Sequence, residues 1–386
     1  MALVTRALSP STFEEAAGAL AQAGAEGSTV RIRGGGTKLG WGAVTPDPDL
    51  ELRTSALEEI VEHNVGDLTA VLQAGVPFDR AQEVFAAHAQ RLALDPPSGA
   101  RPGSAGQATI GGMIAAGDCG PLRHRYGAPR DLAIGMTVAL SDGTIARSGG
   151  KVIKNVAGYD LAKLFSGSFG TLGVILSVSV RLHPLPESTA TALGASSDAD
   201  VLSAASRALA AAPLELEAFD IAWRSGRGGL LARAGGAESG RRGPRIALLM
   251  REAGLEQVDV VEDDDALWAR QRAGQRSRAR ALMRIAARPS SLADVLRATD
   301  ACEGTLVGRA ALGSYFVELG PEAVGRLREH LPAGTRSMLL DAPAAVRKAA
   351  NPWGAGDSAA LVLMKRVKAQ FDPAGACNPG VFVGGI

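Results

Sequence analysis

A segment near the start of the sequence combines three consecutive glycines with a hydroxyl and basic side chains. It reads RGGGTKLGWG from Arg33 and follows a β-rich stretch. Its successive backbone amides could form an anion-binding nest around a diphosphate, with a threonine hydroxyl as a further donor. A plain tight turn is the alternative for the same glycines. The residues expected to bind are Arg33, Gly34, Gly35, Gly36, Thr37 and Lys38.

The spacing in this segment argues against the two commonest nucleotide-binding glycine motifs. Leu39 occupies the position of the third glycine in the G-x-G-x-x-G pattern of Rossmann domains. The segment also lacks the G-K-S/T ending of a P-loop. An NAD(P)-dependent dehydrogenase is therefore disfavoured.

A second segment, residues 109–117, places paired glycines where a helix is expected to begin. Free amide groups and the positive end of the helix dipole would favour a phosphate there. The small residues that follow would let a flat ring lie against the backbone. Tight helix packing is the alternative explanation. The candidate binding residues are Thr109, Ile110, Gly111, Gly112, Ala116 and Gly117.

A third segment, residues 149–175, joins a short amphipathic helix to the β-rich run GVILSVSVRL. Gly167, Gly170 and Gly173 recur at three-residue steps between the two. Glycines in such a series let the backbone approach a flat or charged ligand closely. The candidate binding residues are Asp160, Gly170, Gly173, Val174 and Ile175.

No complete catalytic motif accompanies these loops. The five histidines are scattered, and no metal site is expected. His124 lies between two arginines near the second loop and is a weak candidate for a base, although an isolated histidine is more often structural. The three cysteines are far apart, which argues against a disulfide framework, a zinc site or an iron–sulfur cluster in this chain.

A run of arginines in the second half of the sequence is the other candidate for contact with a substrate. Residues 270–288 contain seven arginines. A planar guanidinium group suits a two-pronged contact with a carboxylate, and Arg270 and Arg272, which follow Trp268, are the candidates. For the whole run, a solvated helical face is the default interpretation, and a docking surface for an acidic partner subunit is the sharper one.

The pattern of elements predicts an α+β protein. In the first half, helices are expected at residues 11–24, with a capping box between Ser11 and Glu14, at 56–64 and from 77 onward. Strands are expected at 29–33, 50–54 and 68–75, and a hairpin at 133–140 and 144–147. After residue 188, alanine-rich helices alternate with short strands at 215–222, 245–251, 257–261, 306–311 and 314–319.

Length and composition indicate a soluble protein of two domains. The chain has 386 residues, which is more than one hydrophobic core usually serves. The net charge of +1 gives no reason to expect nucleic acid as a partner. We find no signal-peptide pattern and no apolar run long enough to span a membrane. We therefore expect a cytoplasmic protein, with any membrane association coming through partner subunits.

The three glycine-rich segments, in this order and spacing, resemble the PCMH-type FAD-binding family of flavoproteins related to vanillyl-alcohol oxidase. The sequence KNVAGYDLAKL before the third segment is most similar to the FAD-binding subunits of glycolate oxidase, also called glycolate dehydrogenase. The family's R-Y-G sequence matches residues 125–127 and adds Tyr126 and Gly127 to the candidate cofactor contacts. Members with covalently bound flavin have a histidine at the position of Thr37, so the resemblance implies non-covalent FAD.

The resemblance also implies an architecture and a role. It implies a two-subdomain FAD-binding domain at residues 1–187, an α+β cap domain at 188–340, and a segment at 341–386 that returns to the first domain. It implies oxidation of glycolate, or a similar 2-hydroxy acid, to glyoxylate in a complex with a second flavoprotein and an iron–sulfur subunit. The histidine-rich metal and base motif of related catalytic subunits is absent from this sequence.

Two other functions are compatible with the same residues. A self-sufficient FAD-dependent oxidase or dehydrogenase of another alcohol or 2-hydroxy acid would turn over its substrate as an isolated chain. A structural subunit that retains FAD without cycling would bind flavin but transfer none of its electrons.

Overall fold

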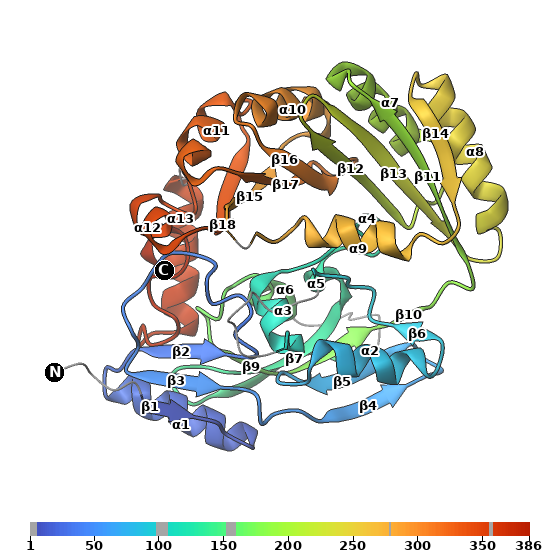
Figure 1. Ribbon diagram of the computed structural model, residues 1–386. Coiled ribbons are helices and arrows are strands. Elements are labelled where there is room, and N and C mark those ends of the chain that lie inside the picture. The colour runs from blue at the N-terminus through green and yellow to red at the C-terminus, as the bar shows by residue number, and fades with distance from the viewer. Residues whose placement is uncertain (1–5, 98–106, 152–159, 278, 355–357) are drawn as a thin grey trace.

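The computed structural model describes residues 6–97, 107–151, 160–277, 279–354 and 358–386. Two assemblies of strands lie one above the other in Figure 1. The lower assembly contains a three-stranded parallel sheet and a five-stranded antiparallel sheet, and the upper one is an eight-stranded antiparallel sheet. We refer to the eight-stranded sheet as the cap sheet. The predicted fold class, α+β, is confirmed.

The lower assembly carries most of the glycine-rich loops. The three-stranded sheet, in the order β1-β3-β2, consists of β1 (Arg6–Leu8), β2 (Val30–Arg33) and β3 (Leu50–Arg53). The five-stranded sheet, in the order β4-β5-β9-β7-β8, consists of β4 (Ile60–Asn64), β5 (Thr69–Gln73), β7 (Ala133–Ala139), β8 (Ile145–Gly149) and β9 (Val174–Arg181). A further pair joins β6 (Gln90–Arg91) to β10 (His183–Pro184).

Helix α1 (Phe13–Ala25) joins the two lower sheets. Its buried face, which includes Ala16 and Leu20, packs in one apolar cluster with Leu52 of β3 and Val174 of β9. The remaining helices of this assembly are short: α2 (Phe78–Ala86), α3 (Ile110–Ala116), α4 (Arg123–Tyr126), α5 (Pro129–Leu132) and α6 (Leu161–Phe165).

The cap sheet has helices on the face that points away from the lower assembly (Figure 1). Its strands, in the order β14-β11-β13-β12-β16-β17-β15-β18, are β11 (Thr189–Ser196), β12 (Ala218–Arg224), β13 (Arg227–Gly235), β14 (Glu256–Val261), β15 (Ala281–Ala286), β16 (Thr305–Arg309), β17 (Ser314–Leu319) and β18 (Arg336–Asp341). The helices are α7 (Ala199–Ala211), α8 (Ser239–Glu252), α10 (Leu292–Ala301) and α11 (Val324–His330), with 3-10 turns η1 (Pro289–Ser291) and η2 (Pro321–Ala323). Fully buried Leu202, Phe219, Ile246 and Leu296 belong to the core between the helices and the sheet.

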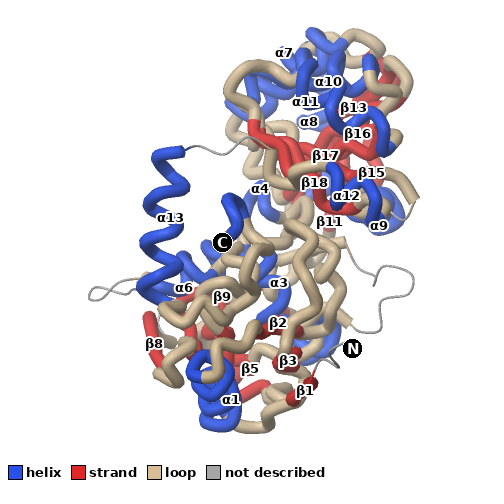
Figure 2. The backbone as a smooth tube through the Cα atoms, turned by 90° about the vertical axis from the view of Figure 1, so that its left-hand side faces the viewer, coloured by secondary structure: helices blue, strands red, loops and turns tan. Residues whose placement is uncertain are grey.

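One more helix, α9 (Asp265–Ala273), lies between the cap sheet and the lower assembly. After β18 the chain forms α12 (Ala344–Ala349), α13 (Ser358–Phe371) and η3 (Val383–Gly385). Helix α13 runs along the side of the molecule (Figure 2).

The tail after α13 lies against β2 in the lower assembly. The N–H group of Val30 donates to the carbonyl oxygen of Ala376, and that of Asn378 donates to the carbonyl oxygen of Val30, both at 2.8 Å. Nζ of Lys368 donates to the carbonyl oxygen of Thr171 at 2.7 Å and so attaches α13 to the loop before β9. The last part of the chain therefore contacts the first sheet and the third glycine-rich segment.

Several predicted elements are confirmed, including the strands at 29–33 and 50–54 and the hairpin now seen as β7 and β8. The helix predicted at 56–64 is wrong. Residues of this segment favour helices, but β4 pairs with β5 in an antiparallel ladder, and pairing with a distant strand overrides local propensity. The predicted capping box is shifted by one residue, because Thr12 is the N-cap and exchanges hydrogen bonds with Glu15.

The strand predicted at 245–251 is also wrong, because these residues belong to α8. A short apolar run does not distinguish a buried strand from a buried helix segment. The buried residues Ile246, Ala247 and Met250 share one helical face against the cap sheet. The helix begins before this run and includes Pro244, which conceals it in the sequence.

Candidate functional site

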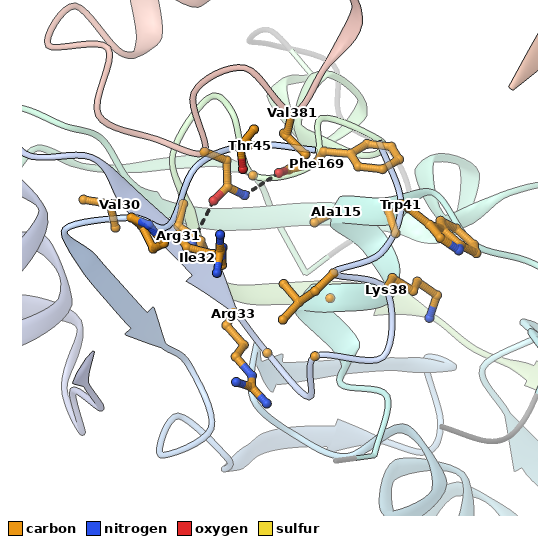
Figure 3. A pocket seen from close by; sticks show the side chains of 18 of the residues that line it. Val30, Arg31, Ile32, Arg33, Lys38, Trp41, Thr45, Ala115, Phe169 and Val381 are labelled. Carbon is orange, nitrogen blue, oxygen red and sulfur yellow. Dashed lines mark hydrogen bonds between the residues drawn. The ribbon is translucent and has the colours of Figure 1, made fainter. Parts of the chain in front are cut away.

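A cavity of about 390 Å³ lies where the loop after β2, the start of α3, the loop before β9 and the tail meet (Figure 3). It brings together the predicted residues Arg33, Gly34, Gly35, Gly36, Thr37, Lys38, Thr109, Gly111, Gly112, Ala116, Gly170, Gly173 and Ile175. Six other predicted residues are outside its lining, namely Ile110, Gly117, Tyr126, Gly127, Asp160 and Val174.

The loop after β2 presents a row of backbone amides. Within the part of the chain that the structure describes, no acceptor receives a hydrogen bond from the N–H groups of Gly34, Gly35, Gly36, Thr37 and Lys38. The φ of Gly36 is +76°, a conformation that favours glycine, so the loop can curve at this point. Neighbouring donors without internal acceptors suit the oxygens of a diphosphate, and the loop therefore fits the predicted cofactor.

Two of these glycines are also required for packing. A Cβ atom on Gly34 would lie 2.2 Å from Oγ1 of Thr109, and one on Gly35 would lie 1.6 Å from the carbonyl oxygen of Gln107. Both distances are far below van der Waals contact, so only glycine lets this loop lie against residues 107–109. The first and second glycine-rich segments therefore form one continuous wall.

The start of α3 differs from the expectation of free amides. The N–H groups of Ile110 and Gly111 donate to carbonyl oxygens in the segment that follows β5, at 3.0 and 2.8 Å. The N–H group of Gly112 donates to Oγ1 of Thr109 at 3.3 Å. The expectation of free donors at this helix N-terminus is therefore wrong, because neighbouring acceptors already use them.

Gly112 contributes open space to the cavity. A Cβ atom on this residue would have only Oγ1 of Thr109 within 4 Å, at 3.1 Å, and would otherwise enter the cavity. Ala115 and Ala116 continue the same wall with small side chains. This part of the wall leaves space beside the backbone, and the contact with a flat ring stays a prediction.

Asn378, in the tail, connects two walls of the cavity. Its Oδ1 accepts a hydrogen bond from the N–H group of Ile32 at 2.8 Å, and its Nδ2 donates to the carbonyl oxygen of Phe169 at 2.6 Å. Its φ is +41°, and asparagine is one of the few residues that tolerate this region. Sequence reasoning assigned no site residue to the tail, because the dipeptide Asn378-Pro379 signals a turn but no ligand.

The cap sheet contacts the loop after β2 through Asp341, the last residue of β18. The carboxylate of Asp341 accepts from Nε1 of Trp41 at 3.2 Å and from Nε of Arg276 at 2.9 Å. Arg276 also donates to the carbonyl oxygen of Thr37 at 3.3 Å. Asp341 and Trp41 are 2% and 3% exposed, so water is excluded from much of this contact. Charge-assisted hydrogen bonds of this kind attach the loop to the cap sheet.

Tyr126 lies at another contact between the two assemblies. Its hydroxyl accepts from Arg91 at 3.0 Å and donates to Glu217 at 3.2 Å, and Arg91 and Glu217 form a buried ion pair. The ring of His183 lies 4.5 Å from the Tyr126 ring, centroid to centroid. Burial is the main cause that raises the pKa of Tyr126 above its usual value. The residue thus connects the lower assembly to the segment before β12.

His124 and Asp160 lie away from the cavity. The ring of His124 packs edge-on against Phe219 at 5.9 Å, and burial is the main cause that lowers its pKa. Its Nδ1 is buried and has no hydrogen-bond partner among the described residues. Asp160 forms an exposed ion pair with Lys163 at 2.9 Å. Neither residue has a contact that indicates catalysis.

The arginine-rich segment 270–288 does not form one solvated face. Arg270 is exposed, whereas Arg272 lies 4.0 Å from Asp95, a largely buried carboxyl whose pKa is raised to about 7, mainly by desolvation. Helix α9 ends at Ala273, and the chain then turns into the cap sheet, so Arg276 points toward the lower assembly. The interpretation of this segment as one solvated helical face is wrong, and the docking surface stays a prediction. Arg270 and Arg272 do not line the cavity.

Among the described residues, no helix has both the length and the apolar character needed to cross a membrane.

The first part of the chain is similar to known FAD binding domains. Residues 5–149 match the family model FAD_binding_4, an FAD binding domain. Glycolate oxidase subunit GlcD of Bacillus subtilis (strain 168) is 39% identical over 161 residues, which is 42% of this chain and 33% of that protein. D-lactate dehydrogenase of Archaeoglobus fulgidus is 37% identical over 175 residues, which is 45% of this chain and 38% of that protein. The chain thus spans well under half the length of these two relatives.

A solved structure has the same fold over nearly the whole chain. An alkyldihydroxyacetonephosphate synthase superposes with a TM-score of 0.69 and 12% sequence identity, covering 97% of this chain and 76% of that one. At this identity the likeness concerns the fold alone.

Proposed function

We propose that this chain, which contains an FAD binding domain and uses FAD as its cofactor, oxidises a 2-hydroxy acid as the FAD-binding subunit of a glycolate oxidase complex. The proposed reaction converts glycolate to glyoxylate, and the proposed partners are a second flavoprotein and an iron–sulfur subunit. The segment from Gly34 to Lys38 carries the proposal, because its residues line the cavity and its amides have no acceptor among the described residues. The names of the two relatives, both of which concern 2-hydroxy acids, support the substrate class.

The described residues account for how the cofactor would be held. The amides of the loop after β2 would bind the diphosphate, and the hydroxyl of Thr37 would add a donor. Gly112 and Ala116 leave a flat, small-residue wall, and Asn378 holds the tail against it. We propose non-covalent binding. Bound FAD supplies an acceptor for the hydride equivalent that leaves the carbinol carbon.

The cap sheet would close the reaction site on its second side. Phe316, Met338 and Leu340 of the cap sheet form an apolar cluster with Trp41 and Ala116, which line the cavity. Such a cluster excludes water from the space next to the cofactor. Exclusion of water strengthens every charged contact that a substrate makes there.

The test is the absorption spectrum of the purified full-length chain, followed by anaerobic addition of glycolate or D-lactate. Flavin bands that are bleached by a 2-hydroxy acid would support the proposal for this chain alone. Bands that bleach only after the partner subunits are added would support it for the complex. A folded chain without flavin after reconstitution with FAD, or flavin that no 2-hydroxy acid reduces in either state, would contradict it.

A further inference from the structure

A second, smaller cavity lies between the cap sheet and the segment that follows α3. It has a volume of about 10 Å³, and three arginines contribute to its lining: Arg123 from α4, Arg284 from β15 and Arg309 from β16. Trp41 lines both this cavity and the larger one, so the two share a wall. A ligand in the smaller cavity would therefore lie next to the proposed cofactor site.

Arg309 is buried with much of its hydrogen-bonding capacity unused. The side chain is 1% exposed, and its Nε donates to the carbonyl oxygen of Gly120 at 3.1 Å. In the described part of the chain, its Nη1 and Nη2 have no hydrogen-bond acceptor. The carboxylate of Asp220 lies 3.4 Å from Nη1, an ion pair without hydrogen-bond geometry. Leaving a buried guanidinium in this state costs free energy, and an anionic ligand would recover part of it.

Among the described residues, sulfur atoms are the only side-chain hydrogen-bond acceptors of the other two arginines. Nη2 of Arg284 lies 3.9 Å from Sδ of Met338, and Nη1 of Arg123 lies 3.7 Å from Sγ of Cys119. Sulfur is a weak acceptor, and among the described residues no carboxylate forms an ion pair with either arginine. Burial is the main cause that lowers the pKa of Arg284 from its usual value. Both side chains can therefore accept a stronger partner.

The charges around this cavity do not balance. Among the described residues, the carboxylate of Asp118 lines the cavity beside the three arginines, and the carboxylate of Asp220 forms an ion pair with Arg309. Two neighbouring ion pairs each have no net charge: Lys38 with Asp118 at 3.0 Å, and Arg272 with Asp95 at 4.0 Å. Counted over the residues that the structure describes, the cluster therefore has an excess of two positive charges. Charges withdrawn from water are normally compensated by a partner, so this excess indicates an anion.

We propose that Arg123, Arg284 and Arg309 bind the carboxylate group of the 2-hydroxy acid substrate. The inference rests on the proposed function and adds to it the residues that select the acid. Guanidinium groups match the two oxygens of a carboxylate, whereas the small volume offers no room for a bulky head group. The rest of the acid would extend along Trp41, the wall shared with the larger cavity.

The test uses the FAD-loaded full chain and oxalate, a small carboxylate that cannot be oxidised as a 2-hydroxy acid. Calorimetric titration compares the wild type with Arg284→Met, Arg284→Lys and Arg288→Met. Arg284 is only partly buried, so methionine can replace its aliphatic part without a large cavity. Arg288 is exposed and follows the same strand, which makes it the matched control.

We expect Arg284→Met to weaken oxalate binding at least tenfold, Arg284→Lys to weaken it less, and Arg288→Met to leave it unchanged. All variants should keep the FAD content of the wild type. Without oxalate, Arg284→Met should melt no lower than the wild type, because the substitution removes an uncompensated charge. An arginine with a structural role alone would instead lower the melting temperature and leave oxalate affinity unchanged.

Two results would overturn the inference: no oxalate binding by the FAD-loaded wild type, or equal affinity in Arg284→Met. These results are distinct from failure of the proposed function. A chain that binds oxalate through Arg284 but whose flavin no 2-hydroxy acid reduces, alone or with partners, would keep the anion site and contradict the proposed oxidation. It would also contradict the assignment of this anion as substrate.

Discussion

Arg276 donates from Nε to Oδ2 of Asp341 over 2.9 Å, although the two residues are 65 positions apart in the sequence. The pair lies at the boundary between the cap sheet and the loop after β2, where Arg276 also contacts the carbonyl oxygen of Thr37. Only 14% of the Arg276 side chain and 2% of the Asp341 side chain are exposed. The geometry of the amide row therefore depends on a charge held by the cap sheet.

Replacing Asp341 with asparagine should reduce both stability and FAD affinity. The substitution leaves the partly buried guanidinium of Arg276 without its counter-charge, and losing one partner of a buried pair costs about 3 kcal/mol. Urea unfolding and fluorescence titration with FAD would measure the two effects. The control is Asp294→Asn, since the pair of Asp294 with Arg297 is exposed on both sides and such pairs contribute about 1 kcal/mol or less. Equal losses in the two variants would refute the role given to Asp341.

Gly35→Ala should abolish FAD retention through a backbone clash. The added Cβ atom would lie 1.6 Å from the carbonyl oxygen of Gln107, so the loop after β2 would have to move away from residues 107–109. Flavin absorbance per folded chain is the measurement. Gly18→Ala, on α1 with no atom within 4 Å of the new Cβ, is the control and should be neutral or stabilising by about 0.5–1 kcal/mol. Normal flavin content in Gly35→Ala would mean that the two loops need not touch.

Asn378→Asp should weaken FAD binding while preserving the shape of the side chain. The variant loses the Nδ2 donor and places an anionic oxygen against the carbonyl oxygen of Phe169. The loss of such a hydrogen bond typically costs about 1–3 kcal/mol, which corresponds to at least a fivefold increase in the dissociation constant of FAD. Asn351→Asp is the control, because Asn351 makes comparable hydrogen bonds in an exposed turn. If both variants bind FAD equally, the tail is not part of the cofactor site.

Asp220 should make the protein less stable as the pH rises through the acid range. Burial, partly offset by Arg309, raises the pKa of this carboxyl from 3.8 to about 6. The folded state thus binds more protons than the unfolded state between about pH 4 and pH 6, so the free energy of unfolding falls as pH rises through this window. Above pH 6, ionised Asp220 lowers the free energy of unfolding by about 2–3 kcal/mol, at about 1.36 kcal/mol per unit of pKa shift.

The variant Asp220→Asn removes this titration. Relative to the wild type, its free energy of unfolding should therefore increase between pH 4 and pH 7, as measured by urea unfolding at several pH values. Asp95, whose pKa is also raised, should supply much of the pH dependence that is left. The exposed Asp263→Asn is the control and should show the wild-type pH profile. A parallel profile for Asp220→Asn would show that Arg309 compensates the charge fully.

The turn in the loop after β2 was predictable because it depends on local residues. Gly36 turns the loop by its own backbone conformation, and the composition of residues 33–38 is sufficient to suggest a nest. Other features depend on distant parts of the chain. The sequence predicts a helix at residues 56–64, but in the structure β4 of this segment pairs with β5. The sequence also predicts free amides at the start of α3, but acceptors in the segment after β5 bind them.

The charged residues around the site were harder to predict, because their positions also depend on distant parts of the chain. Arg284 and Arg309 come from neighbouring parts of one sheet, but nothing in their sequence positions shows that the sheet faces the lower assembly. Arg270 and Arg272 were the natural candidates beside Trp268, yet α9 leaves them outside both cavities. The Asn378 side chain bonds to Ile32 and Phe169, and these contacts exist only in the folded structure.

The position of Asn378 also sets an order of events during synthesis. The amides of residues 34–38 leave the ribosome more than 300 residues before the side chain that connects β2 to the loop before β9. Because domains begin to fold as they emerge, the first sheet can form while one wall of its cavity is still being translated. Tight capture of FAD is therefore expected only after residue 378 has emerged, so the nascent chain passes through a folded state without cofactor that chaperones and proteases can recognise.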